Sequence, residues 1–228
     1  MAWGLPIVLG DVTDTRYSIA ATHNLTEEFY FDVNKGQMVN FDFSQIDQLL
    51  PGYLAVYDFM RFASSLLTEG QRVFITLALS EPQADRALLS QLAERYHLAL
   101  NLYDLTLPAR VITATRDQVD PRIPLVDLTG YFQCRSAAGE KLYHNRNTHW
   151  NLEGNALAGM VIAAYLQRTW FATPAALPPD LEACAEEKNR TNKRVSAEDI
   201  LAFVSEQLLP RINAGVSEGQ GARREGED

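Results

Sequence analysis

The sequence predicts an α/β fold, with a mostly parallel sheet flanked by helices, on three observations. Two apolar runs, Arg72–Leu79 and Ile123–Leu128, have the length and composition of buried strands. Helical patterns separate and follow these runs, as in a parallel sheet with crossover helices. The chain has 228 residues, of which 46% are hydrophobic and 21% charged, which suits one domain with a substantial core.

The N-terminal part is expected to contain a strand and a β-hairpin. Leu5–Leu9 is a short apolar run that ends at Gly10-Asp11, as a buried strand ends in a loop. Residues 28–33 and 38–43 flank a segment with the turn residues Asn34 and Gly36. The alternation of aromatic and polar residues predicts a hairpin excursion beside the main fold.

The central part predicts alternating helices and strands. A helix over Leu54–Thr68 carries an apolar face, and Ser80 with Gln83 and Pro82 predicts the capped start of a helix that ends near His97. Further along, Asn151 is a suitable N-cap for the longest apolar-periodic helix. The expected elements here are a helix with Leu54, Tyr57, Phe59, Met60, Phe62 and Leu66 on its face, a strand at 98–102, a helix at 107–115, and a helix at 152–170 with Leu152, Ala156, Leu157, Met160, Val161, Ala164 and Trp170 on one side.

The predicted domain organisation is one α/β domain over residues 1–171 with a C-terminal appendage. Residues 172–195 are expected to be a linker, because they begin Ala/Pro-rich and continue charged and polar. Residues 196–212 predict an amphipathic helix, and residues 213–228 predict a disordered tail that is almost free of apolar residues.

Composition argues against several kinds of partner and cofactor. The net charge of −9 argues against a nucleic-acid surface, and no run approaches the roughly 20 apolar residues of a membrane span. Cys134 and Cys184 can form a disulfide, although their spacing does not require one, and no cysteine or histidine cluster predicts a metal. No cofactor is expected. The chain as written lacks a signal peptide, which predicts a cytoplasmic protein, or a periplasmic or secreted one if an N-terminal extension exists.

The candidate catalytic residue is His149, in a polar loop directly before the longest helix. A histidine general base needs an acceptor that orients its ring and a nucleophile that it deprotonates. The residue two positions before it is Asn147, whose amide can accept a hydrogen bond but cannot stabilise an imidazolium by charge. On spacing alone, packing or capping at the helix N-terminus is the favoured interpretation of His149.

The stretch Asn147-Thr-His-Trp-Asn-Leu-Glu-Gly154, followed by an Ala-rich helix, resembles the last conserved block of SGNH (GDSL-type) hydrolases. It is most similar to the branch with an Asp-x-His-Trp loop, which includes alginate-type O-acetyltransferases and many bacterial proteins. Residues 75–83, 104–110 and 124–129 resemble earlier blocks of that branch in the same order. The resemblance implies an SGNH/flavodoxin-like fold and carbohydrate ester chemistry.

The resemblance also implies roles for individual residues. His149 matches the base, Asn147 stands at the position of the orienting Asp, and Trp150 would contact substrate. The stretch Gly10–Asp14 can be aligned with the first block of the family, which puts Val12 at the position of the nucleophile, or with the third block, which puts Gly10 where the family has the oxyanion Asn. The second alignment, with Gly10-Asp11 in the oxyanion region, is preferred because a polar loop and a hairpin follow, and it implies that the first strand–helix units are missing. No Gly-Asp-Ser motif is present, and Ser18, Ser64 and Ser80 lack the context of a nucleophile.

These departures leave three functions open. One is an ester hydrolase or carbohydrate O-acyl transferase, catalytically impaired as written and without an identified nucleophile, acting on a carbohydrate or acyl-ester substrate. The second is a non-catalytic module that binds a saccharide or a protein. The third is a fragment of a longer hydrolase. The sequence predicts no oligomeric state.

Overall fold

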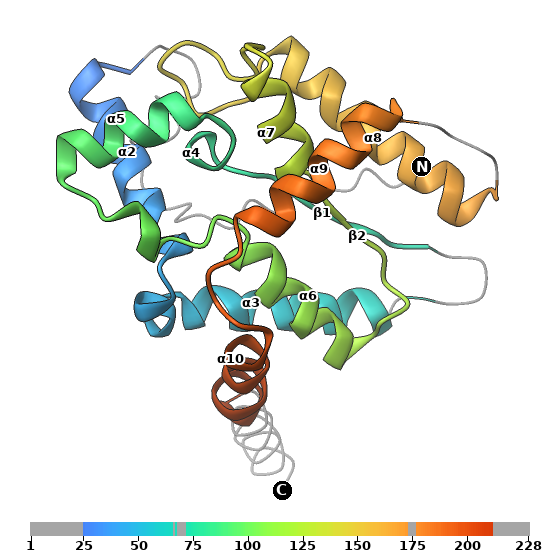
Figure 1. The fold of residues 1–228 in the computed structure, drawn as a ribbon. Coiled ribbons are helices and arrows are strands. Elements are labelled where there is room, and N and C mark those ends of the chain that lie inside the picture. Colours follow the sequence, from blue (N-terminus) through green and yellow to red (C-terminus); the bar gives the residue numbers. More distant parts are fainter. Residues whose placement is uncertain (1–24, 66, 68–71, 173–176, 212–228) are drawn as a thin grey trace, which may run out of the picture.

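The fold is largely helical around one small parallel sheet, as the computed structural model shows for residues 25–65, 67, 72–172 and 177–211 (Figure 1). Strand β1 (Ile75–Leu77) pairs in parallel with β2 (Leu125–Asp127), and the register aligns Thr76 with Val126. Within these described ranges the sheet has two strands. The general α/β class is therefore observed, in a form with far more helix than the sequence patterns predicted.

Helices supply the remaining framework. They are α2 (Glu27–Gln37), α3 (Ile46–Ser65), α4 (Glu81–Ala84), α5 (Arg86–Tyr96), α6 (Leu107–Val119), α7 (Thr129–Ala137), α8 (Leu152–Trp170), α9 (Pro179–Thr191) and α10 (Ala197–Ala202), with short 3₁₀ segments at Met38–Phe41, Phe43–Gln45 and Leu100–Leu102 and a π-helical continuation of α10 at Phe203–Leu208.

Helices cover both faces of the sheet, which makes three layers. Ile75, Leu77 and Leu125 pack against a core formed by α3, α6 and the α10 segment. Val126 belongs to a second core, on the other face, formed with α7, α8 and α9. In Figure 1, α3 and α6 lie below the strands, while α7, α8 and α9 lie above them. A third cluster joins α2 to α5 at one end of the sheet.

Several predicted elements are confirmed, and local capping explains where they start. Ser80 precedes α4, where the Gln83 side chain accepts from the Ser80 backbone N–H at 2.9 Å. The single helix predicted from there to about His97 is divided into α4 and α5 by Asp85, whose extended backbone caps α5. Asn151 caps α8 by accepting from the Gly154 N–H at 2.9 Å. The predicted helices at 107–115 and 152–170 correspond to α6 and α8, and the strands predicted at 72–79 and 123–128 correspond to β1 and β2.

The predicted β-hairpin over residues 28–43 is wrong. Thr26 accepts from the Phe29 N–H and starts α2, and Glu27 and Glu28 stand at the end of the helix that favours negative charge. Tyr30 and Asn34 share the buried face at helical spacing, and the Asn34 amide donates to the Tyr30 carbonyl at 2.9 Å. The expected Asn-x-Gly turn therefore lies inside a helix.

The predicted strand at residues 98–102 is also wrong, and two predicted helix faces are confirmed only in part: Met60 of α3 and Leu157, Val161 and Ala164 of α8 are buried as predicted. Leu100–Leu102 forms a 3₁₀ turn after His97, which ends α5 in the left-handed region at φ 54°. Helix α3 starts earlier than expected, and its buried face runs through Ile46, Leu50, Tyr53, Val56, Met60 and Ala63, which leaves Phe62 60% exposed. On α8 the buried residues are Gly154, Leu157, Ala158, Val161 and Ala164, whereas Leu152 is 78% exposed.

The predicted linker and appendage are integral parts of the fold. Residues 179–191 of the expected linker form α9, which buries Leu181 and Ala185, and a disulfide joins Cys134 of α7 to Cys184 of α9. The following α10 segment buries Ile200, Phe203, Val204 and Leu208 in the core shared by α3 and α6. The expected strand at Leu5–Leu9 and the tail at 213–228 lie outside the described residues.

Candidate functional site

The His149 loop is a short hairpin held at its base. Tyr143 and Trp150 form an antiparallel bridge, and the His144 N–H donates to the His149 carbonyl at 3.0 Å. The Tyr143 hydroxyl donates to the Leu79 carbonyl just after β1. These contacts place the loop at the carboxyl end of β1. In open parallel sheets, ligand sites lie beyond the carboxyl ends of the strands.

Two residues of the 147–154 stretch, Asn151 and Gly154, hold this loop against the start of α8. Asn151 donates its side-chain amide to the Lys141 carbonyl at 2.6 Å and its backbone N–H to the Leu142 carbonyl at 3.0 Å. A Cβ on Gly154 would collide with the Leu142 carbonyl. Asn151 and Gly154 therefore have structural reasons to be present, independent of any reaction.

The imidazole of His149 lies against the side chain of Asn147. Nδ1 of His149 is 2.6 Å from Oδ1 of Asn147, and the same oxygen accepts the His149 backbone N–H at 3.1 Å. The Asn147 atom that faces His149 contacts two N–H donors, as an amide oxygen does. Because this oxygen accepts a hydrogen bond from the ring, the imidazole proton lies on Nδ1. Nε2 is then the unprotonated nitrogen, as a general base requires.

The other sequence-predicted site residues are not all brought to this loop. Trp150 packs its ring 4.9 Å from that of Phe132, so part of its surface belongs to the core. Gly10 and Asp11 lie outside the described residues. Ser64 donates to Asp120 at 2.8 Å, and Ser80 starts α4, so each of them has a structural role.

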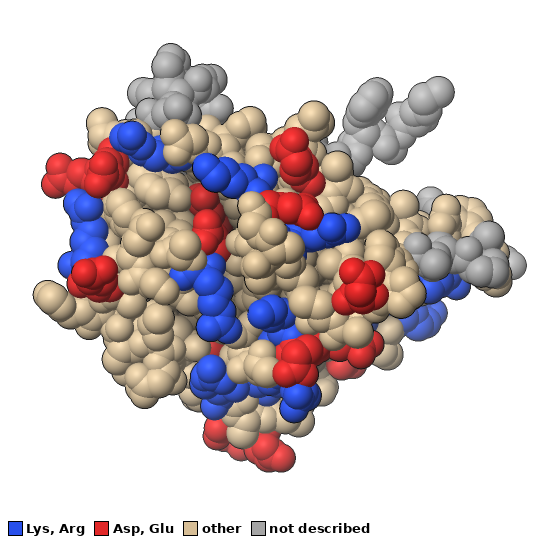
Figure 2. All heavy atoms as spheres, turned by 45° about the horizontal axis from the view of Figure 1, so that its top comes forward, with Lys and Arg blue, Asp and Glu red and all other residues tan. Residues whose placement is uncertain are grey.

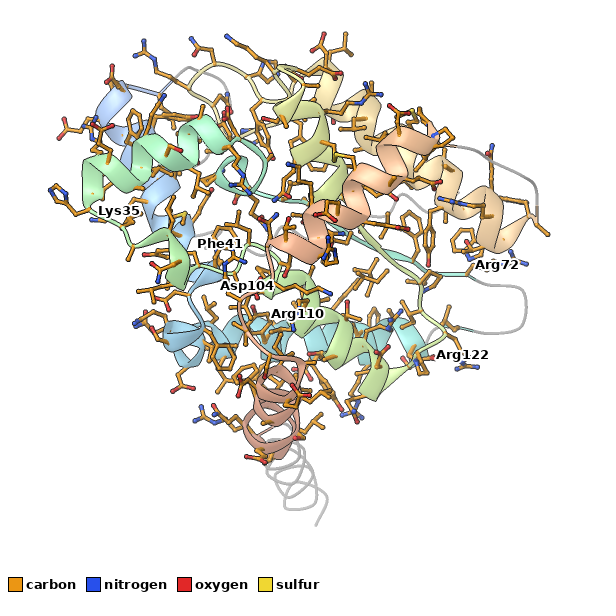
Figure 3. All side chains as sticks on the ribbon, in the orientation of Figure 1. Lys35, Phe41, Arg72, Asp104, Arg110 and Arg122 are labelled. Atoms are coloured by element: carbon orange, nitrogen blue, oxygen red, sulfur yellow. A yellow bond between two sulfur atoms is a disulfide. The ribbon has the colours of Figure 1, made fainter. Side chains whose placement is uncertain are left out.

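Asp104 joins the block at residues 104–110 to the segment at Arg194 and Val195, and this set of hydrogen bonds is called the clamp below. The fully buried carboxylate of Asp104 accepts from the Thr106 hydroxyl and backbone N–H, from Arg110 at 2.9 Å, and from the backbone N–H groups of Arg194 and Val195. Figure 3 shows Asp104 and Arg110 side by side near Phe41. Burial alone would raise the pKa of Asp104, but these hydrogen bonds outweigh it and hold that pKa below its usual value.

A pocket that the sequence did not suggest lies beside the His149 loop. Its volume is about 440 Å³, and its walls come from α2, from the start of α4 and α5, and from residues 140–146. Of the described residues, His144 and Arg146 line it while His149 does not. Glu81 is 8% exposed and lines it, and its Oε2 has no hydrogen-bond partner among the described atoms.

Glu81 is electrostatically unusual for a carboxyl group. Burial raises the pKa of Glu81 to about 7. A hydrogen bond from Tyr30 partly lowers this pKa, and the negative charge of Asp85 raises it further. Burial and the same carboxylates raise the pKa of Tyr30 and, from the far wall, of Tyr143. Nothing in the sequence marked Glu81, since a Glu after a helix cap is ordinarily exposed.

Glu81→Gln is expected to stabilise the protein at about pH 8 and to leave it nearly unchanged at about pH 4. The folded pKa of about 7 exceeds the ordinary 4.5, so the folded state binds the proton more tightly and wild-type stability falls as pH rises between these values. The neutral amide avoids this loss, which amounts to about 3 kcal/mol. Urea denaturation at several pH values, with exposed Glu28→Gln as the control, measures the difference; an equal gain for both variants would contradict the explanation.

Three observations on the described residues bear on nucleic-acid, metal and membrane binding. Acidic and basic side chains are interspersed on the face shown in Figure 2 and do not form a continuous basic stripe. Across the described ranges no three His, Cys, Asp or Glu side chains are grouped to hold a metal ion. No helix there is long and apolar enough to cross a membrane.

Comparison with protein-family models, with curated proteins and with solved structures found no match to this chain. The geometry of the His149 loop and of the adjacent pocket therefore carries the functional argument.

Proposed function

We propose that the His149 loop is the acid–base half of an SGNH-like site that acts on acyl esters, with a carbohydrate ester as the substrate class. The supporting observation is the 2.6 Å contact between His149 Nδ1 and Asn147 Oδ1. It orients the ring and leaves Nε2 to accept a proton from an attacking hydroxyl. The resemblance of residues 147–154 to the last SGNH block agrees with this role.

The neutral partner predicts slow chemistry. Asn147 fixes the ring but does not stabilise the imidazolium that forms when the base takes a proton, so the charge that the triad Asp would supply is missing. The proposed activity is therefore that of an impaired esterase or acyltransferase. Its nucleophile is not identified by the hydrogen bonds of the described residues.

The prediction for catalysis uses two opposing substitutions. Asn147→Asp is expected to raise p-nitrophenyl acetate hydrolysis, because the carboxylate adds the charge that stabilises the imidazolium. His149→Ala is expected to abolish the turnover and also the labelling by a fluorophosphonate probe, whose site identifies the nucleophile by mass spectrometry. His97→Asn is the matched control, since Asn tolerates the left-handed conformation at that helix end.

Two results would reject the proposal. One is hydrolysis that is equal in wild type, His149→Ala and Asn147→Asp. The other is the absence of both turnover and probe labelling in the Asn147→Asp variant, measured on protein that retains the thermal stability of the wild type.

The disulfide supports an oxidising location for this activity. Both cysteines of the chain are joined in the Cys134–Cys184 bridge. Such bridges persist mainly in periplasmic, secreted or surface proteins. We infer a periplasmic or secreted setting over a cytoplasmic one. Thiol alkylation of protein from its native compartment, followed by mass spectrometry, tests it: modified cysteines would argue for the cytoplasm.

A further inference from the structure

Two of the four histidines in the chain lie opposite each other in the hairpin that carries the candidate base. Tyr143 and Trp150 form its antiparallel bridge, so the next pair in the same register is His144 with His149. The His144 N–H donates to the His149 carbonyl at 3.0 Å, which agrees with this pairing. Directly opposite residues of an antiparallel pair project from the same face, with Cβ atoms about 4.5–5.5 Å apart.

The face that carries the two histidines is the solvent side of the hairpin. The rings of Tyr143 and Trp150 both contact the ring of Phe132 in the core. Side chains alternate between the two faces along a strand, so the adjacent residues His144 and His149 project away from that core. Both are exposed. A single ion from solution can therefore reach both imidazoles.

The imidazole of His149 has the hydrogen bonding of a metal ligand. A histidine ligand binds the metal through its unprotonated nitrogen and usually donates the other ring N–H to an oxygen that fixes the ring. Oδ1 of Asn147 lies 2.6 Å from Nδ1 of His149 and provides such an oxygen. Nε2 therefore keeps its lone pair for an ion.

His144 supplies a second imidazole that is held less firmly. Its side chain makes no hydrogen bond to the described residues, and it lines the adjacent pocket, whereas His149 does not. Because His144 is exposed, its side chain can change rotamer without displacing the core. This rotation brings a ring nitrogen of His144 to an ion held by His149, and water can complete the coordination.

The charges around the two histidines determine which ion fits. Lys141 and Arg146 are exposed in the same loop, and they oppose a cation that binds through charge alone. Glu140, at the base of the hairpin, already pairs with Arg135 at 2.9 Å. Imidazole coordinates Cu²⁺, Ni²⁺ and Zn²⁺, whereas Mg²⁺ and Ca²⁺ prefer carboxylate, carbonyl and water oxygens. These surroundings therefore favour a transition metal.

We propose that His144 and His149 form a surface site for one divalent transition-metal ion, Ni²⁺, Cu²⁺ or Zn²⁺, in which Asn147 positions the ring of His149. The hairpin register creates this pair, which the spacing of the two histidines along the chain did not suggest. The site needs no nucleophile, so it does not rest on the proposed ester chemistry. Metal binding and proton acceptance use the same nitrogen of His149, so a bound ion blocks the base.

The test is calorimetric titration of the full chain, without an affinity tag, with Ni²⁺ and with Mg²⁺ near neutral pH. Wild type is expected to bind Ni²⁺ and not Mg²⁺. His144→Ala and His149→Ala are each expected to weaken Ni²⁺ binding at least about tenfold, because each leaves a single imidazole. His97→Asn removes a histidine at the end of α5 and is the control, expected to bind Ni²⁺ as wild type does.

Two further variants test the positioning role of Asn147. Asn147→Ala is expected to weaken Ni²⁺ binding about tenfold, because it removes the oxygen that fixes the ring. Asn147→Asp keeps an oxygen there and is expected to bind Ni²⁺ at least as tightly as wild type. Equal losses in these two variants would contradict the positioning role.

Three results would overturn the metal site itself. One is the absence of Ni²⁺ binding by wild type. Another is unchanged binding by both histidine-to-alanine variants of the hairpin, which would place the ion elsewhere. The third is equal binding of Mg²⁺ and Ni²⁺, which would make the binding a general effect of the negative charge of the protein.

Discussion

Replacing Asp104 with Asn is expected to lower the free energy of unfolding by about 3–5 kcal/mol. The carboxylate is fully buried and accepts hydrogen bonds from both ends of the clamp, from Thr106 and Arg110 on one side and from the backbone of Arg194 and Val195 on the other. An amide presents one acceptor oxygen and two N–H groups to these donors, so several of them lose their partner. The Arg110 guanidinium would also lose the charge that balances it.

The effect should be visible in three measurements. Calorimetry is expected to show a melting temperature lower by roughly 10 °C. Hydrogen exchange is expected to quicken most in residues 197–208, because the clamp fixes the chain just before that segment. Since the folded pKa of Asp104 lies below its ordinary value, the stability it contributes is present above about pH 4 and is lost as pH falls further, so wild type and variant should converge in acid.

An exposed carboxylate supplies the control for Asp104. Glu187 pairs with Arg190 on the outer face of α9, and surface pairs of this kind contribute about 0–1 kcal/mol. Glu187→Gln should therefore leave the melting temperature nearly unchanged. Equal effects of Asp104→Asn and Glu187→Gln would show that the clamp is not a major source of stability.

Removing the Cys134–Cys184 bridge is expected to cost about 4 kcal/mol. The bridge closes a loop with a sequence separation of 50, and the chain-entropy model assigns that value to a loop of this length. It also joins α7 to α9 where they pack closely, since a Cβ on Gly130 of α7 would collide with the Ala185 carbonyl of α9. The double variant Cys134→Ser and Cys184→Ser should melt at a lower temperature and expose α9 first.

Comparison of oxidised and reduced samples separates the bridge from the substitution. Urea denaturation of wild-type protein with and without a reductant should show the same loss as the double variant, and reductant should leave the double variant unchanged. Similar midpoints for oxidised and reduced wild type would mean that α9 is held by its packing alone.

The sequence predicted the starts of those helices whose N-cap residue and its hydrogen-bond partner lie within one turn of each other. Asn151 with Gly154 and Ser80 with Gln83 start α8 and α4 as expected, because a cap depends on groups within one turn of chain. Helix α9 also carried such signals, with Pro179 in its first turn, acidic residues at its start, and Lys188 and Arg190 at its end. Its overall polarity obscured them and led to the prediction of a linker.

The α2 segment shows how an alternating pattern misleads. Phe29, Phe31 and Val33 alternate as strand residues do, but the face that is buried runs through Tyr30 and Asn34. The outcome depends on contacts with Leu88, Leu89 and Leu92 of α5, which is distant in sequence from this segment. Tertiary packing therefore decided between helix and hairpin, as it commonly overrides weak propensities.

For the candidate site, the sequence by itself determined the contact of Asn147 with His149 and the start of the adjacent helix, because both depend on local hydrogen bonds. Asn147 contacts the ring two positions further along, and Asn151 caps the Gly154 N–H three positions further along. The tertiary structure alone decided the pocket, the burial of Glu81 and the clamp at Asp104. Those features join segments far apart in the chain, such as Asp104 with Val195 and Tyr143 with Leu79. Their energies depend on the exclusion of water by the folded chain, which no local pattern specifies.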